Sequence, residues 1–343
     1  MKLTNKNNLD GVFCSNMEHY MNKRMVDISD LNAEYSVTQL LSPLTIAVLF
    51  KRHKDEISKD VSDCLYLLQG LVVHQLMENS VYDGKIPITK KVENQILDSL
   101  SKIKDNYPDI SKDIMRALKD TGLFCDESED LLLEKPLVIE LNGVRISGIP
   151  DVYDKKTKTL LDYKHPGIKS AERNMQSYFM QTNIYRYMLQ KNGYPVDKID
   201  IVLFYRDWAK AKTLSEINYP KSAIETVNVP IMSDKEVHDF LYERINTIKA
   251  YESEHILPPC TEEERFQDPI KYAVVRPGNK KASKICSSQE EAISYIEGKG
   301  WKNAYTEIRE SEPKRCISYC DVNTFCDFYH DYMRKRQEKN QPF

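Results

Sequence analysis

The sequence has few of the features that mark a membrane, secreted or disordered protein. No apolar run approaches the roughly 20 residues that span a bilayer, and the longest, over 44–50, has the size of a core segment. The opening MKLTNKNNLDG lacks the apolar core of a secretory signal. Glycine (11) and proline (15) are scarce and 41% of residues are hydrophobic, which excludes a disordered chain. We therefore expect a folded cytoplasmic protein that makes no membrane contact.

Charge and cysteine content set two further limits. The 49 lysines and arginines against 52 aspartates and glutamates leave a net charge of -3, so total charge provides no attraction to nucleic acid. Eight cysteines are many for a chain of this kind. In a reducing compartment they should be buried free thiols, unless some of them cluster as metal ligands.

Periodicity predicts a mixed α/β chain with a largely helical beginning. Apolar spacing predicts helices over 64–78, 93–104 and 111–119, the last with a serine cap. Two β-hairpins follow: LVIEL and VRISGI flank Asn142-Gly143, which favours a type I′ turn, and DVYD and TLLDYK flank KKTK. The later elements are expected to be a helix over 170–191, a strand over 200–205, a helix opened by a capping box over 233–236 and ending near 254, a strand over 272–276, a helix over 288–297, a strand over 304–309 and a C-terminal helix.

Two aspartates and a lysine on neighbouring strands carry the clearest chemical meaning. Gly148-Ile-Pro-Asp151 precedes Asp162-Tyr-Lys164, and alternation along a strand places Asp162 and Lys164 on one face, with Asp151 across from them. Two carboxylates on one face repel each other unless a cation lies between them, and such oxygen ligands suit Mg²⁺ or Mn²⁺. A lysine beside the metal can position water and stabilise charge on a phosphate, which equips the site for phosphodiester hydrolysis. A surface hairpin with ordinary charges is the alternative.

Two helices add polar residues at helical spacing. His74 and Glu78 share a stripe of the otherwise apolar helix that contains Gly70, and they would need partners if buried. Histidine can also ligate a metal, although an isolated core histidine gives the same pattern. Gln181 and Tyr185 share a stripe of the helix after the lysine, where they could contact the lysine or a scissile phosphate, or form only a polar helix edge.

In this order, the four motifs resemble those of the PD-(D/E)XK nuclease superfamily, in particular its RecB-like exonuclease branch, over about residues 35–210. The resemblance implies a restriction-endonuclease-like α/β core with a mixed central sheet flanked by helices, over residues 1–259. Residues 260–343 would form a small α+β appendage bounded by cysteines. The implied activity is that of a deoxyribonuclease dependent on Mg²⁺ or Mn²⁺.

The family's roles carry over to matching positions in this chain. Glu78 would support a metal ligand rather than bind the ion. The metal ligands would be His74, Asp151, Asp162 and the main-chain carbonyl of Tyr163, and the catalytic set would be Asp151, Asp162, Lys164, Gln181 and Tyr185.

Four cysteines form a second candidate site. Cys316, Cys320 and Cys326 are close in sequence, and Cys260 lies upstream in a Pro-Pro-Cys turn. Four thiolates can close a tetrahedral Zn²⁺ site or hold a [4Fe–4S] cluster, but the C-x2-C knuckle typical of structural zinc is missing. Many RecB-like nucleases carry an iron–sulfur cluster, so the resemblance favours it over zinc. Those relatives place the first cysteine ahead of the histidine helix, whereas residues 42–47 contain none here and Cys260 would replace it.

Positive charge is concentrated locally near the DYK motif. A basic segment over 154–173 can follow a phosphate backbone, although a solvated charged face is the more ordinary explanation. No base-reading module and no helicase P-loop are visible, so we expect DNA ends or single strands to be bound with little sequence specificity, and any unwinding to come from a helicase or recombination partner. The predicted DNA-binding residues are Lys155, Lys156, Lys158, Lys169 and Arg173.

These features lead to one expected function with named alternatives. We expect a DNA exonuclease for recombination, repair or processing in the cytoplasm of a bacterium, or of the host if the chain is encoded by a phage. A structure-selective endonuclease or resolvase on the same fold would share every motif. A catalytically inactive DNA-binding subunit, or a zinc-stabilised interaction protein with a coincidental hairpin, would not need the complete set.

Overall fold

The chain divides into two compact units that are each discontinuous in sequence. The computed structural model describes residues 2–8, 10–11, 14–15, 17, 31–83, 85–88, 108–126, 128–279 and 281–340, so the predicted helix over 93–104 lies outside the described residues. Unit 1 comprises residues 1–4, 42–59 and 245–343, and unit 2 comprises 5–41 and 60–244. The expected boundary between residues 259 and 260 lies inside unit 1.

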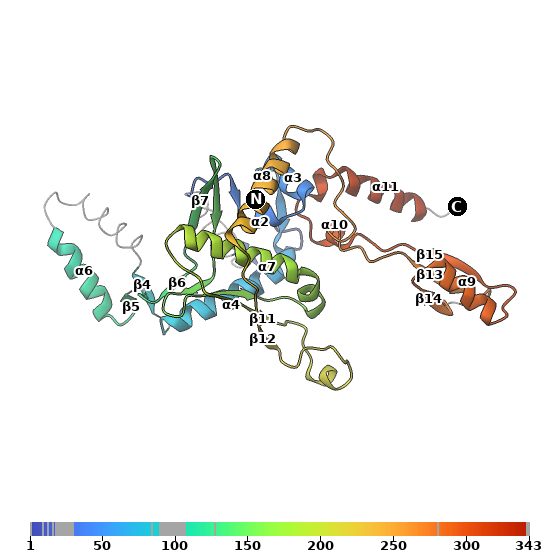
Figure 1. Ribbon diagram of the computed structural model, residues 1–343, viewed down its shortest axis with the longest axis horizontal. Helices are drawn as coiled ribbons and strands as arrows, with labels where there is room; N and C mark the ends of the chain where they lie inside the picture. The colour runs from blue at the N-terminus through green and yellow to red at the C-terminus, as the bar shows by residue number, and fades with distance from the viewer. Residues whose placement is uncertain are drawn as a thin grey trace. The chain divides into compact units, whose positions relative to one another are not determined.

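A five-stranded mixed sheet is the centre of unit 2 (Figure 1). The strand order is β12–β11–β10–β9–β6, in which β10 and β11 are parallel and the other neighbours are antiparallel. The parallel pair requires a crossover connection, which the long helix α7 (Ile168–Lys191) supplies. The strands are β6 (Leu131–Leu133), β9 (Val152–Asp154), β10 (Thr159–Lys164), β11 (Lys198–Phe204) and β12 (Ile224–Asn228).

A second sheet of unit 2 contains the other predicted hairpin. Strands β7 (Leu137–Leu141) and β8 (Val144–Gly148) pair antiparallel, and β2 (Tyr35–Ser36) pairs parallel to β8. The connecting residues Asn142 and Gly143 have φ angles of 52° and 77°. Positive φ at both central positions is the type I′ turn that the Asn-Gly pair predicts, so this hairpin is confirmed.

Helix α7 forms the apolar core of unit 2 together with the central sheet. It packs against β7, β10 and β11 and against α2 (Val37–Leu41), and its Ile184, Met188 and Leu189 are fully buried. The helix begins where the carboxylate of Asp207 accepts a hydrogen bond of 2.8 Å from the main-chain N–H of Ile168. It ends before Gly193, whose φ of 84° suits glycine after a helix.

The remaining elements of unit 2 lie before the hairpins in sequence. The 3-10 turn η1 (Val61–Cys64) leads into α4 (Leu65–Val81), in which Leu71 is the one buried residue. Strands β4 (Ile86–Ile88) and β5 (Phe124–Asp126) pair parallel around α6 (Pro108–Asp120). The predicted serine cap of α6 is wrong, because the helix already begins at Pro108, and proline is favoured in the first helical turn.

Unit 1 contains a three-stranded sheet of order β14–β13–β15, with α9 (Gln289–Gly298) packed on it. A separate core cluster of Leu49, Ile57 and Val322 lies near α3 (Leu44–Arg52). Helix α8 (Asp234–Tyr251) belongs to unit 2 up to Arg244 and to unit 1 from Ile245. It begins with the predicted capping box, in which the main-chain N–H of Glu236 donates to Ser233 Oγ over 3.2 Å. The other elements are β1 (Lys2–Thr4), β3 (Ser58–Asp60), β13 (Lys271–Val275), β14 (Lys284–Cys286), β15 (Tyr305–Arg309), α10 (Lys314–Ser318), η3 (Asn323–Phe325) and α11 (Asp327–Asn340).

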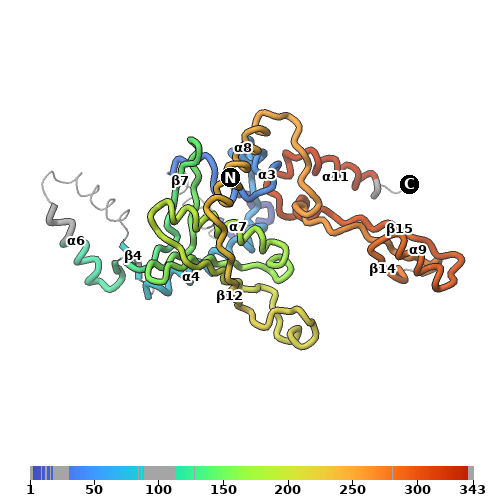
Figure 2. The backbone as a smooth tube through the Cα atoms, in the orientation of Figure 1, coloured from blue at the N-terminus to red at the C-terminus, as the bar shows by residue number. Residues whose placement is uncertain are grey.

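The expected mixed α/β architecture, with a mixed sheet flanked by helices, is confirmed, and the course of the chain can be followed in Figure 2. Strands β12 and β14 were not expected from the sequence, because both are short and lack a clear apolar alternation. Among the helices that the structure describes, none has the length and apolar character needed to cross a membrane.

Gly148, at the end of β8, allows α7 to approach the β7–β8 hairpin closely. A Cβ atom at this position would lie 2.9 Å from both Met188 Sδ and Tyr185 Cε1, and 3.0 Å from Val37 Cγ2. Packed interiors do not accommodate an added methyl group at such distances without displacement. The glycine of the Gly-Ile-Pro-Asp motif therefore sets how closely Tyr185 approaches the strand that leads to Asp151.

Replacing Gly148 with alanine should destabilise the protein by about 1–3 kcal/mol, because the added methyl group overpacks this contact. Chemical denaturation measures the change. Gly70→Ala is the matched control: Gly70 lies within α4 and a Cβ there meets no atom within 4 Å. The control should be neutral or stabilising by up to about 1 kcal/mol, and equal effects of the two variants would contradict the packing argument.

Candidate metal centre

Strand register places the two aspartates of the sequence motif opposite each other. Strands β9 and β10 pair antiparallel with Val152 opposite Leu161, so continuing the register by one position sets Asp151 opposite Asp162. Asp151 Oδ2 also accepts a hydrogen bond of 2.7 Å from the main-chain N–H of Tyr163. The hairpin itself therefore holds both carboxylates at the end of the sheet.

Lys164 lies beside these carboxylates, as the two-residue spacing predicts. Its Nζ is 2.6 Å from Asp162 Oδ2, and Asp162 is only 1% exposed. The same ammonium group lies 5.5 Å from the ring centroid of Tyr178 on α7. Aspartate and lysine are thus paired in a largely desolvated setting, where charges interact more strongly than in water.

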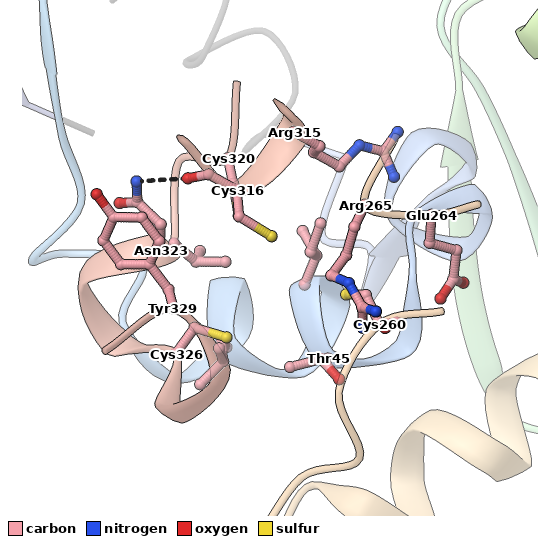
Figure 3. Close-up of a pocket in the computed structure, with 13 residues that line it drawn as sticks. Thr45, Cys260, Glu264, Arg265, Arg315, Cys316, Cys320, Asn323, Cys326 and Tyr329 are labelled. Carbon is pink, nitrogen blue, oxygen red and sulfur yellow. Dashed lines mark hydrogen bonds between the residues drawn. The ribbon is translucent and has the colours of Figure 1, made fainter. Parts of the chain in front are cut away.

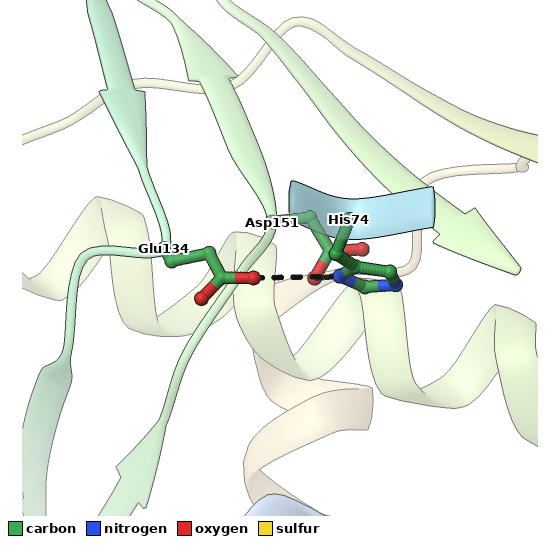
Figure 4. Close-up of side chains that lie close together, drawn as sticks. All are labelled: His74, Glu134 and Asp151. Carbon is green, nitrogen blue, oxygen red and sulfur yellow. Dashed lines mark ion pairs between the residues drawn. The ribbon is translucent and has the colours of Figure 1, made fainter. Parts of the chain in front are cut away.

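Three side chains converge on one point beside this pair (Figure 4). His74 Nδ1, on α4, lies 3.4 Å from Asp151 Oδ1 and 3.4 Å from Glu134 Oε1. The potential ligand atoms of the three residues all lie within 4.8 Å of one another. One nitrogen and two carboxylate oxygens in this arrangement are a donor set that suits Mn²⁺ or Mg²⁺.

Glu134 is a candidate ligand that sequence reasoning missed. It follows β6 with a φ of 41°, and its main-chain N–H donates to the carbonyl of Asp151 over 2.8 Å. This left-handed conformation is costly for a residue other than glycine, and such strain is concentrated at functional sites. The sequence signal is weak, since one acid before Lys135-Pro136 belongs to no recognisable pattern.

Burial and mutual repulsion set the protonation of the centre. Burial, followed by the charge of Asp162, raises the pKa of Asp151 to about 7. Burial alone would lower the pKa of His74, but the carboxylates of Glu134 and Asp151 outweigh it and raise that pKa. Burial alone would also lower the pKa of Lys164, but the charges of Asp162 and Asp151 outweigh this effect and raise the pKa. The carboxylates of this centre carry negative charge that a divalent cation can neutralise.

The remaining predicted site residues lie at different distances from this centre. Gln181 Nε2 donates to the Tyr185 hydroxyl over 3.1 Å, and burial followed by the charge of Asp162 raises the pKa of Tyr185 to about 12. Glu78 lies further along α4, where it accepts from Gln75 over 3.4 Å.

The predicted DNA-binding residues fall into two groups. Lys155, Lys156 and Lys158 lie in the β9–β10 turn, at the start of β10, whereas Lys164 lies at its end, about 20 Å away at strand rise. In that turn Lys156 pairs with Asp130 over 2.7 Å and Lys158 with Asp197 over 3.3 Å. Only Lys169 and Arg173, exposed on the first turns of α7, follow Lys164 closely in the chain.

The four predicted cluster cysteines line one pocket in unit 1 (Figure 3). Cys260, Cys316, Cys320 and Cys326 are all free thiols. Arg265 and Arg315 line the same pocket, and Cys320 and Cys326 pack against the cluster around Val322. Burial raises the pKa of Cys260 to about 12 and that of Cys320 to about 11, so these two thiols are protonated at neutral pH.

Thr45 and Ile46 of α3 line the same pocket. By the resemblance to RecB-like nucleases, the first cluster cysteine is expected in this region, residues 42–47, which contains no cysteine here. Cys260, which is distant in sequence, lines the pocket beside these residues. Among the described residues, no three of the sulfur atoms lie within 4.8 Å of one another. Thiolates on a single tetrahedral zinc lie about 3.8 Å apart, given Zn–S bonds of about 2.3 Å.

Comparisons with known proteins point to one family. The model of the PD-(D/E)XK nuclease superfamily matches residues 65–327. No curated protein matches the chain significantly. Among solved structures, that of SSO0001 is 13% identical with a TM-score of 0.29 and covers 62% of this chain and 74% of its own. A phage related exonuclease from Haemophilus somnus 129PT is 15% identical with a TM-score of 0.25 and covers 48% and 82%, respectively.

The centre should bind Mn²⁺ more tightly as the pH rises through about 7. Below its pKa of about 7 the Asp151 carboxyl is protonated, and His74, whose pKa is raised, also holds a proton that a ligated ion must displace. Affinity should therefore fall by about tenfold per pH unit for each displaced proton on the acid side. Calorimetric titration with Mn²⁺ at about pH 6, 7 and 8 measures this, and a pH-independent affinity would contradict the assignment.

Proposed function

Because this chain belongs to the PD-(D/E)XK nuclease superfamily, we propose that it is a DNA exonuclease whose catalytic centre contains His74, Asp151, Asp162 and Lys164. The nuclease fold implies a DNA substrate and a divalent metal. The observation that carries the proposal is the buried pairing of Asp162 with Lys164 over 2.6 Å, beside the His74–Glu134–Asp151 group.

The residues present fit a divalent cation. Burial and repulsion between Asp151 and Asp162 leave negative charge that Lys164 only partly balances, and the donors are the oxygen and imidazole atoms that Mg²⁺ and Mn²⁺ accept. Asp151, His74 and Asp162 would hold the ion, with Glu134 and the Tyr163 carbonyl as further ligands. When bound, the ion supplies Lewis-acid stabilisation and a water of lowered pKa.

The protein's own groups would align and stabilise the reacting phosphate. Lys164 keeps its proton, since its pKa is raised, so its role is to hold a phosphate oxygen or orient the attacking water rather than to remove a proton. Gln181 holds the Tyr185 hydroxyl, which stays protonated and can donate a hydrogen bond to the substrate. Glu78 would support α4 behind His74.

The exonuclease assignment and the RecB-like branch rest on the four motifs taken together, in the order His74, Asp151, Lys164 and Gln181–Tyr185. A role in recombination, repair or processing, in a bacterium or a phage, follows from that branch. Lys169 and Arg173 would contact the DNA backbone near the centre, with the lysines of the β9–β10 turn further away. Unwinding would be the task of a helicase partner.

We also propose that the four-cysteine pocket holds a [4Fe–4S] cluster rather than zinc. Each thiolate of such a cluster binds a different iron, so the sulfur atoms lie farther apart than on one zinc ion. Among the described residues no three of the sulfur atoms all lie within 4.8 Å of one another, which is wider than a single zinc ion requires and supports this choice. Arg265 and Arg315 would balance part of the negative charge of four thiolates.

The exonuclease should degrade end-labelled linear DNA in the presence of Mg²⁺ or Mn²⁺ and leave a covalently closed circle intact. Asp162→Asn should reduce the rate by at least about a hundredfold, because it removes a charge that the reaction depends on. Gel analysis of both substrates measures this.

The matched control is Asp200→Asn, which alters a buried aspartate on the adjacent strand that pairs with Lys198 over 2.6 Å. It should cleave at close to the wild-type rate. Cleavage of the circle would assign the chain as an endonuclease instead. Equal rates for wild type and Asp162→Asn would overturn the catalytic assignment.

Anaerobically purified protein should contain iron and absorb visible light. Cys320→Ser should lose both signals, because it removes a proposed cluster ligand, whereas Cys286→Ser should keep them, since that buried thiol lies outside the pocket. Elemental analysis with absorbance spectroscopy measures the effect. Zinc without visible absorbance would replace the iron–sulfur assignment, and the absence of both metals would reject a four-thiolate site.

A further inference from the structure

The segment over 205–223, between β11 and β12, leaves the central sheet beside the catalytic lysine. In the parallel pair, Lys164 lies opposite Leu203, so this segment starts next to the end of β10 that carries Lys164. Figures 1 and 2 show it in yellow as a projection that leaves β11, contains the 3-10 turn η2 (Lys210–Leu214) and returns to β12. We call it the β11–β12 arm.

The base of the arm is attached to the chain that follows Lys164. The main-chain N–H of Arg206 donates to the carbonyl of Pro166 over 3.1 Å, and Asp207 accepts from Ile168 at the start of α7. Within the arm, Trp208 Nε1 donates to the carbonyl of Pro220 over 2.8 Å. Hydrogen bonds therefore hold the base of the arm against the residues that follow Lys164, and a further hydrogen bond orders the arm itself.

The tip of the arm exposes two apolar side chains. Leu214 and Ile217 are 92% and 101% exposed, more than any other large hydrophobic residue in the described part of the chain. Folding gains nothing from apolar side chains in this position, because they remain in water. Leucine and isoleucine are also among the side chains that proteins insert between DNA bases.

Positive charge and an aromatic ring connect the arm to the metal centre. Arg206, Lys210, Lys212 and Lys221 outnumber Asp207 and Glu216, and Asp207 already caps α7. The guanidinium of Arg206 lies 3.9 Å from the ring centroid of Tyr66 on α4. Tyr66, Gly70 and His74 follow each other at four-residue spacing, and Gly70 leaves open space on this stripe. Arg206 therefore contacts the stripe of α4 that contains Gly70 and His74.

We propose that the β11–β12 arm separates the strands at a duplex end: Leu214 and Ile217 insert at the end, and Arg206 with Tyr66 receives the strand that enters the centre. Charge complementarity and the position beside Lys164 favour DNA over a protein as the occupant of this surface. The inference rests on the proposed nuclease function and adds an element of substrate selection to it.

The test measures strand opening separately from cleavage. Full-chain protein in Ca²⁺ is mixed with a blunt duplex that carries 2-aminopurine at its terminal pair, and unpairing raises the fluorescence. Wild type should give this rise, and the double variant Leu214→Ser, Ile217→Ser should lose it while binding single-stranded DNA equally. Ile256→Ser, which alters another strongly exposed isoleucine (83%), should behave as wild type.

Cleavage in Mg²⁺ then completes the assignment. The double variant should degrade the blunt duplex about tenfold more slowly than wild type and the unpaired strand at the wild-type rate, because only the duplex requires unstacking. No fluorescence rise with wild type bound to the duplex, or an equal rise with the double variant, would overturn the proposal and leave the tip as a surface for a protein partner. A rise without any cleavage would reject the nuclease function while supporting the arm.

Discussion

The repulsion between Asp151 and Asp162 is the constraint on which unit 2 depends. Hairpin register holds these two carboxylates opposite each other at the end of a buried strand, where water cannot screen them. Lys164 pairs with Asp162, whereas burial, followed by the charge of Asp162, raises the pKa of Asp151. A fold that only needed stability would gain by replacing such a group with apolar residues, so the cost is understandable if a cation and a phosphate complete the site.

The surrounding structure keeps that group desolvated and aligned. Helix α7 connects the parallel strands β10 and β11, and Gly148 lets it approach until Tyr185 lies against the strand that leads to Asp151. Asp207 fixes the start of α7 from the arm that follows β11. One connection therefore positions Lys164, the helix that follows it and the surface that we expect to meet the DNA.

Local sequence patterns predicted the parts of this site that depend on neighbouring residues. The Asn-Gly turn, the two-residue spacing of Asp162 and Lys164 and the four-residue spacing of Gln181 and Tyr185 each fix a geometry by backbone periodicity alone. Glu134 could not be found in this way, because its left-handed backbone and its contact with His74 arise from tertiary packing. The three lysines of the β9–β10 turn are close to the DYK motif in sequence, but the length of β10 separates them from Lys164, a distance that closeness in sequence does not reveal.

The central claim is that the buried carboxylates form a metal centre, and anomalous diffraction from crystals soaked in Mn²⁺ tests it most directly. The account predicts one manganese peak bounded by the side chains of His74 and Asp151, and the refined ligands would show whether Asp162, Glu134 or both complete the sphere. Soaked Asp151→Asn crystals should lose the peak. A wild-type structure without manganese at these side chains, at a concentration that saturates the protein in solution, would contradict the account.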